Sequence, residues 1–163
     1  YNPQVSPFRS YVGGGRVAPA SPETLATEYW KLYESFISKY PEDHFYLLSV
    51  NPVYCTLRYR GNTVTNSKVI RFNNTLRKLV KKSGYKNVTY VDTYKNVFQK
   101  NGWVHKKSAY RYAIKYRKMN VRYMRESSSY QLHYTDSVDK KLFKYVNDFI
   151  KNDMNISKAI NQK

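Results

Sequence analysis

Apolar residues along this chain switch between helical spacing and unbroken runs. Ser21, Pro22 and Glu23 provide an N-cap, a first-turn proline and an early acidic residue, which together predict a helix over about residues 22–39. The apolar residues that follow at mostly helical spacing, and so predict its buried stripe, are Leu25, Trp30, Leu32, Tyr33, Phe36 and Ile37. The run FYLLSVNPV at residues 45–53 stays apolar until Asn-Pro, so it predicts a strand buried on both faces, as in a parallel sheet.

The same alternation continues through the second half of the chain. After a polar loop, Asn66–Ser67 are predicted to cap a helix that ends at Ser83–Gly84. NVTYVDTY at residues 87–94 predicts the next strand, followed by a shorter helix near 93–101. A last amphipathic helix precedes a polar tail after residue 152, and its apolar stripe is Val138, Leu142, Tyr145, Val146, Phe149 and Ile150. Helices that alternate with buried strands indicate an α/β layer fold with right-handed crossovers.

The amino-terminal segment is rich in proline and glycine. Tyr11–Val12 is a short apolar pair that leads directly into Gly13, Gly14 and Gly15, which predicts a short strand entering a glycine loop. The chain begins at Tyr1 rather than at methionine, and we therefore expect it to come from a longer precursor.

Composition changes this picture mainly through charge. The 163 residues suit one domain, and 29 Lys and Arg against 11 Asp and Glu give a formal net charge of +18. This balance favours anionic partners such as nucleic acid, anionic lipid or acidic glycopolymer. Cys55 is the only cysteine, which excludes an intrachain disulfide. No apolar run reaches the roughly 20 residues of a membrane span, so no transmembrane segment is expected.

Four segments of the chain together resemble the SGNH (GDSL-type) hydrolases, especially versions from low-GC bacteria. They are FYLLSVNPV, NSKVIRFNNTLRKL, NVTYVDTYKNV and QLHYTDSVDKKLFKYVNDFI, and the similarity covers about residues 22–104 and 127–151. The resemblance implies a three-layer flavodoxin-like parallel sheet and an enzyme that hydrolyses or transfers esters, often acyl groups on carbohydrate. It also implies a nucleophilic serine, an oxyanion-hole glycine, a Gly-x-Asn-Asp asparagine and an Asp-x-x-His pair.

The resemblance places the family's catalytic base at His133. A histidine in this role takes the proton of the nucleophile and returns it to the leaving group. The position three residues earlier, where the family has aspartate, is occupied by Tyr130. A phenol is neutral near pH 7 and supplies no carboxylate to stabilise an imidazolium, so the base is present without its usual partner. A packed structural histidine is the alternative interpretation.

The glycine triplet can be aligned with the family in two ways. If the triplet is aligned with the family's Gly-Asp-Ser motif, Gly15 stands in place of the nucleophilic serine, and the segments that carry the next two motifs of the family are missing. We favour the second alignment, with the Gly-x-Asn-Asp motif. It places Gly13, Gly14 and Gly15 in the oxyanion region, with Gly15 in place of the asparagine. Under both alignments the nucleophilic serine is missing. None of the remaining candidates lies in a Gly-x-Ser-x-Gly elbow: Ser10, Ser49, Ser108, Ser127, Ser128 and Ser129.

The favoured alignment also implies a sheet that is incomplete on its amino-terminal side. Without the first two strands, the strand near Ser10–Gly13 would form an open edge beside a partly uncovered core. A complementing N-terminal segment, a partner chain or a homodimer is expected to cover this edge. A purely structural role, in which the chain pairs with a partner through this strand, is a third hypothesis.

A basic, tyrosine-rich segment separates Trp103 from Leu132. It is HKKSAYRYAIKYRKMNVRYMRE, at about residues 105–126, where the family often has only a short loop. In a helix its basic residues would form one cationic stripe with tyrosines along the edge. The stripe consists of Arg111, Lys115, Lys118, Arg122 and Arg125, with Tyr112 and Tyr116 beside it. Such a surface would hold a polyanion through its cations and stack sugars or bases on its tyrosines, and a solvated helix face is the structural alternative.

These patterns predict one SGNH-hydrolase-like domain at residues 1–152 and a polar tail at 153–163. Its expected function is related to ester hydrolysis or acyl transfer on an acylated carbohydrate, with this chain inactive or incomplete. A non-catalytic module that binds an anionic polymer or nucleic acid is the alternative. No cofactor is implied, and no metal site is expected because His44 and His105 lack spaced Asp, Glu or Cys ligands. The resemblance favours a secreted or cell-surface bacterial location.

Overall fold

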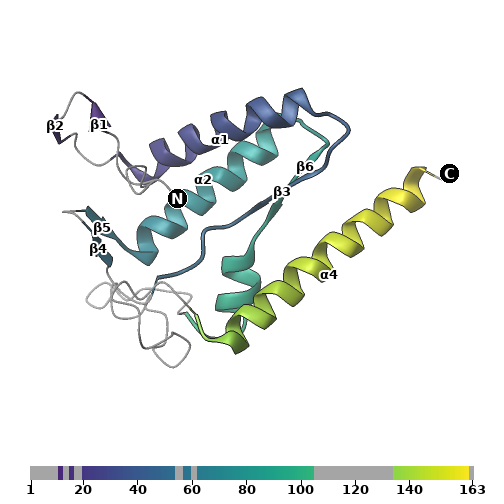
Figure 1. Ribbon diagram of the computed structural model, residues 1–163. Coiled ribbons are helices and arrows are strands. Elements are labelled where there is room, and N and C mark those ends of the chain that lie inside the picture. The colour runs from purple at the N-terminus through teal and green to yellow at the C-terminus, as the bar shows by residue number, and fades with distance from the viewer. Residues whose placement is uncertain are drawn as a thin grey trace.

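The computed structural model describes residues 11–12, 15–16, 20–53, 57–59, 62–104 and 134–161. In chain order the elements are β1 (Tyr11–Val12), β2 (Gly15–Arg16), α1 (Pro22–Lys39), β3 (Phe45–Leu48), β4 (Leu57–Tyr59), β5 (Asn62–Val64), α2 (Asn66–Ser83), β6 (Val88–Val91), the π-helical segment η1 (Tyr94–Gln99) and α4 (Asp136–Asn161). They form a mixed helix–strand fold around a small parallel sheet. Figure 1 shows α1 and α2 together on one side of β3 and β6, and α4 on the other.

The strands β3 and β6 pair in parallel, with Phe45 opposite Val88 and Leu48 opposite Val91. Parallel strands need a crossover connection, and α2 supplies it here. This confirms the predicted parallel relation between the two apolar segments. Among the described residues no third strand joins this sheet, so the structure supports the α/β class and does not extend to a full flavodoxin-like sheet.

The strand β3 is shorter than the strand predicted over residues 45–53. Only Phe45–Leu48 belong to the ladder, and the side chain of Leu48 is 39% exposed, so the prediction of burial on both faces was wrong there. Side chains alternate across the sheet. Leu47 packs in the core beneath α1 and α2, while Tyr46 contacts α4 on the opposite face.

The helix α1 has the predicted bounds, and its cap follows the predicted chemistry. The backbone N–H of Thr24 donates to Ser21 Oγ at 3.0 Å, which satisfies a free donor of the first turn. The buried stripe on α1 differs from the predicted one, since Leu32 is 58% and Phe36 49% exposed. The core between α1, α2 and the sheet is formed instead by Ala26, Trp30, Ile37, Leu47, Phe72, Leu76, Val80 and Val88.

The helix α2 begins one residue away from the predicted cap. Thr65 is the N-cap, with its Oγ1 accepting from the N–H of Lys68 at 3.2 Å, so Asn66 and Ser67 already belong to the helix. Gly84 ends the helix as predicted. Its φ of 76° is left-handed, a conformation that glycine adopts without steric cost.

A second core lies between η1 and the start of α4. Its buried members are Val53, Val64, Val69, Tyr94, Val97, Phe98, Trp103, Val104, Tyr134 and Val138. The segment η1 replaces the ordinary short helix predicted near 93–101. The helix α4 runs to Asn161, past residue 152 where a polar tail was predicted to begin. None of the described helices has a stretch apolar and long enough to cross a bilayer.

Two short hairpins complete the described fold. Tyr11–Val12 pairs antiparallel with Gly15–Arg16. Among the described residues it is therefore not the edge strand of the parallel sheet that was predicted near Ser10–Gly13. Leu57–Tyr59 pairs with Asn62–Val64 in the segment predicted to be a polar loop. The available signal for this second hairpin was the alternation of Leu57 and Tyr59 with arginines, followed by Gly61-Asn62 as a turn.

The hydroxyl of Tyr46 attaches α4 to the sheet and should make stability depend on alkaline pH. It donates to Asp153 Oδ2 at 2.9 Å, and burial together with Asp153 raises the pKa of Tyr46 to about 12. A raised tyrosine pKa means that the folded state holds the proton more tightly than the unfolded state. We therefore expect this contribution to be complete below about pH 10 and to disappear between about pH 10 and pH 12.

Urea unfolding at several pH values measures this effect. Tyr46→Phe should lose less stability than the unchanged protein as the pH rises from about 10 to 12. Tyr40→Phe is the matched control, because Tyr40 is 43% exposed. An identical alkaline loss in the unchanged protein and in Tyr46→Phe would contradict the assignment.

Candidate functional site

Most residues that the sequence analysis identified lie outside the described ranges. They are His133, Tyr130, Gly13, Gly14, Arg111, Lys115, Lys118, Arg122, Arg125, Tyr112 and Tyr116. Gly15 is described, and it lies in β2 in register with Val12 rather than in the predicted glycine loop. The described residues do define the carboxyl end of the parallel strands, where an α/β sheet of this kind binds its ligands.

Buried hydroxyl groups join the two strands at this end. Ser49 follows β3 and Thr93 follows β6, and their side-chain oxygens are 2.8 Å apart. Ser49 Oγ also accepts the backbone N–H of Tyr94 at 2.8 Å, while Thr93 Oγ1 lies 3.0 Å from Asn51 Oδ1. The Ser49 hydroxyl therefore caps the start of η1, and Ser49 is 4% exposed.

Two asparagines of α2 hold the segment that follows β3. Asn73 accepts the N–H of Val50 and donates to its carbonyl oxygen, both at 2.8 Å. Asn66 makes the same pair of bonds with Val53, both at 2.7 Å. Each side-chain amide thus satisfies one backbone donor and one acceptor, as a neighbouring strand would.

The spacing of these asparagines matches the segment that they hold. Asn66 and Asn73 are seven positions apart, which places them on one face of α2 and about 10 Å apart along its axis. Val50 and Val53 are three residues apart, and three extended residues also span about 10 Å. The two asparagines therefore hold residues 50–53 along α2, beyond the end of the sheet.

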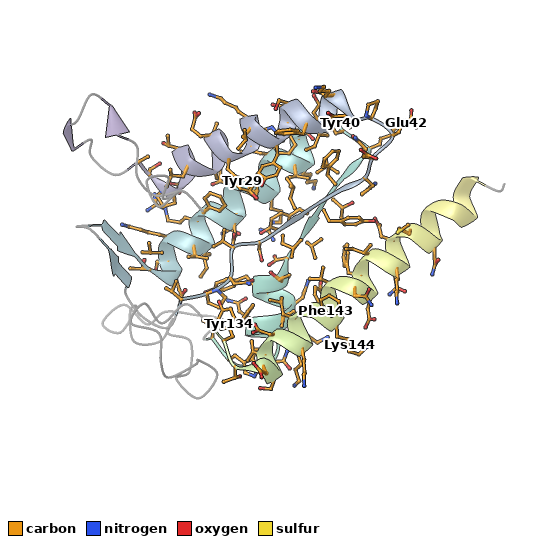
Figure 2. All side chains as sticks on the ribbon, viewed as in Figure 1. Tyr29, Tyr40, Glu42, Tyr134, Phe143 and Lys144 are labelled. Atoms are coloured by element: carbon orange, nitrogen blue, oxygen red, sulfur yellow. The ribbon has the colours of Figure 1, made fainter. Side chains whose placement is uncertain are left out.

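Tyr134 joins the carboxyl-terminal part of the chain to this segment. Its hydroxyl donates to the carbonyl oxygen of Pro52, and its ring lies 5.1 Å from that of Phe98. Burial raises the pKa of the Tyr134 hydroxyl well above its usual value, so the group remains a protonated donor. Figure 2 shows Tyr134 beside the start of α4, at the end of the fold remote from Tyr40 and Glu42.

Asn51 is one of the partly exposed polar residues at this strand end, together with Asp92. Asn51 lies between the two positions held by Asn73 and Asn66. Asn51 Oδ1 accepts from the Thr93 hydroxyl at 3.0 Å, so Nδ2 is the donor end of this amide. An amide donor of this kind can bind a carbonyl or hydroxyl oxygen of a ligand.

Metal ligands do not gather in the described part of the chain. No group of three or more His, Cys, Asp or Glu side chains there is placed to hold a metal ion. His44 lies at the opposite end of the sheet, with Nε2 2.8 Å from Thr89 Oγ1 and 3.7 Å from Asp153 Oδ2.

Comparisons with known proteins identified no relative of this chain. No protein family, no curated protein and no solved structure matches this chain.

The sequence analysis did not identify Asn51, Asn66, Asn73 or Tyr134 as site residues. The two asparagines of α2 did carry a signal. Asn73 is placed among Val69, Phe72 and Leu76 on the apolar face of the predicted helix, and a polar residue there must find a buried partner.

Proposed function

We propose that this chain is an SGNH/GDSL-like hydrolase domain with a flavodoxin-like arrangement, related to ester hydrolysis or acyl transfer on carbohydrate-type substrates. The observation that supports the proposal is the bond from Tyr134 to the carbonyl of Pro52. His133 is covalently joined to Tyr134, and consecutive Cα atoms are about 3.8 Å apart. The bond holds Tyr134 at the carboxyl end of β3. We propose that the preceding residue, His133, contributes its imidazole at this end of the sheet, where a family base is required.

In the proposed site the protein supplies a base and an amide donor. When a nucleophile from outside this chain is supplied, His133 takes its proton and returns that proton to the leaving group. Asn51 donates from Nδ2 to the acyl carbonyl or to a sugar hydroxyl of the substrate. The hydroxyls of Ser49 and Thr93 keep the two strand ends together beneath this position.

We also propose that this chain does not complete the catalytic cycle alone. Tyr130 occupies the position of the family carboxylate, and a neutral phenol stabilises an imidazolium poorly. Ser49, the serine at the end of β3, is buried and bonded to Thr93 and Tyr94. The proposed domain therefore binds acylated carbohydrate but releases no acyl group without a further nucleophile.

A titration with partly O-acetylated xylo-oligosaccharides tests this proposal. We expect the amide NMR signals of Asn51, Val53 and Tyr134 to shift, and free acetate to remain at the level of buffer. The same oligosaccharides after chemical deacetylation are the matched control, and they should shift these signals less. Shifts confined to the opposite end of the sheet, near Asp43 and Asn87, would contradict the proposed site.

The acetate measurement separates activity from binding. Acetate release that disappears in His133→Ala would show that the chain is active, and would correct the proposed inactivity while supporting the family relationship. Release that persists in His133→Ala would contradict the role proposed for this residue.

Binding of an anionic polymer or nucleic acid stays the alternative proposal. It is supported by the formal net charge of +18. The stripe that would carry it, from Arg111 to Arg125, lies outside the described residues.

A further inference from the structure

The strand β6 has an unpaired edge within the described part of the chain. The backbone oxygen of Asn87 accepts from the N–H of Phe45 in β3 at 2.9 Å, and that of Val91 accepts from the N–H of Ser49, the residue after β3, at 3.0 Å. Because alternate residues of a parallel strand point to opposite sides, the peptide groups of Val88 and Tyr90 face away from β3. No charged residue or proline occurs in Val88–Val91, although these are the usual protections of an open edge.

A groove of about 440 Å³ runs along this edge. One wall comes from α2, through Arg77, Val80 and Lys81, and the other includes Phe149 of α4. The residues Val88–Tyr90 of β6 lie between these walls. The groove therefore combines an open backbone edge with a cationic wall on α2 and an aromatic side chain, that of Phe149, on the opposite side.

The charges in the groove favour an anionic occupant. Arg77, Lys81 and Lys95 line it together with a single carboxylate, that of Asp92. The contact between Arg77 Nη1 and Asp92 is 3.6 Å long and partly exposed. A single carboxylate at this distance does not neutralise three cations.

The spacing of the cations matches an extended chain. Arg77 and Lys81 are four positions apart on α2, which corresponds to about 6 Å along the helix axis. Side chains at alternate positions of a strand are about 6.7 Å apart on the same face. We propose that the groove binds an extended acidic segment of a partner protein, which adds to β6 as a further strand and places alternate carboxylates against Arg77 and Lys81.

The same charges disfavour a second copy of this chain as the occupant. Pairing of two β6 edges would bring the cations of both α2 helices together, in molecules that each carry a net charge of +18. In the proposed complex, backbone hydrogen bonds supply affinity and the two walls select acidic and apolar side chains at alternate positions. This inference is independent of the proposed hydrolase relationship.

The test uses a fluorescein-labelled hexapeptide in which glutamate alternates with valine. Binding is followed by fluorescence anisotropy with the full chain at about 0.15 M salt, where distant charges are largely screened. The double change Arg77→Glu and Lys81→Glu should weaken binding by about tenfold or more. Lys78→Glu with Lys82→Glu is the matched control, since it makes the same charge change on α2 away from the groove, and it should alter binding by less than about twofold.

Hydrogen exchange distinguishes strand addition from general charge attraction. The amides of Val88 and Tyr90 should exchange more slowly when the peptide is bound, and a peptide N-methylated at alternate residues should neither bind nor protect them. Equal weakening by both double changes, or unchanged exchange at Val88 and Tyr90, would overturn the proposal. Protection of these amides that increases with protein concentration without peptide would also overturn it, in favour of a self-dimer.

Discussion

Replacing Phe98 with alanine is expected to lower the free energy of unfolding by about 3–5 kcal/mol. The side chain is fully buried in η1, with its ring 6.0 Å from that of Trp103 and 5.1 Å from that of Tyr134. Truncation removes both aromatic contacts and leaves a cavity that the helical segment cannot close. Because domains of this size are stable by only about 5–15 kcal/mol, the loss is a large fraction of the total.

Urea unfolding followed by circular dichroism gives this value directly. Phe143→Ala is the matched control, because Phe143 lies on α4 with 73% of its surface exposed, and its loss should be within about 0.5 kcal/mol of zero. A loss below about 1 kcal/mol for Phe98→Ala would show that the core around η1 is not packed as described.

The second large effect is expected for Asn66→Ala, at about 2–4 kcal/mol. This change leaves the N–H and the carbonyl oxygen of Val53 without the buried amide that now pairs with both. Each unsatisfied buried group costs about 1–3 kcal/mol, and Val53 itself is 6% exposed. Without the Asn66 amide, the segment that contains Pro52 should move more freely, which should weaken the hydrogen bond from Tyr134 to Pro52.

A comparison within α2 makes this measurement specific. Asn74→Ala removes an exposed amide that contacts Arg77 Nη2, and its effect should be within about 0.5 kcal/mol of zero. In the Asn66→Ala protein, the amide of Val53 should also exchange faster than in Asn74→Ala. Equal losses in the two variants would mean that the bonds to Val53 contribute little.

The elements that the sequence predicted well are those with local signals. Ser21 with Pro22 began α1, and Gly84 ended α2, because caps and left-handed glycines act within a few residues of the chain. The continuous apolar runs also predicted the parallel pair β3 and β6.

The parts that differ depend on contacts distant in sequence. The predicted strand at 45–53 stops at Leu48 because side chains from α2, rather than another strand among the described residues, hold Val50 and Val53. An apolar run alone cannot distinguish these two kinds of partner. The exposure of Leu32 and Phe36 likewise follows from how α1 meets α2, which helical spacing does not specify.

The candidate site was predicted less completely than the fold. The sequence directed attention to His133, while the described structure identifies Tyr134, Asn51 and the asparagines of α2. Their roles depend on bonds between segments up to 82 positions apart, as for Tyr134 and Pro52. No pattern within one segment reveals such a bond.

The position of the His133 imidazole is the central claim, and NMR of the unmodified, isotopically labelled chain tests it most directly. We predict nuclear Overhauser effects between the ring protons of His133 and protons of Asn51 and Pro52, at the carboxyl end of β3. Effects from this ring to Asp43, His44 or Asn87, at the amino end of the sheet, would contradict the claim.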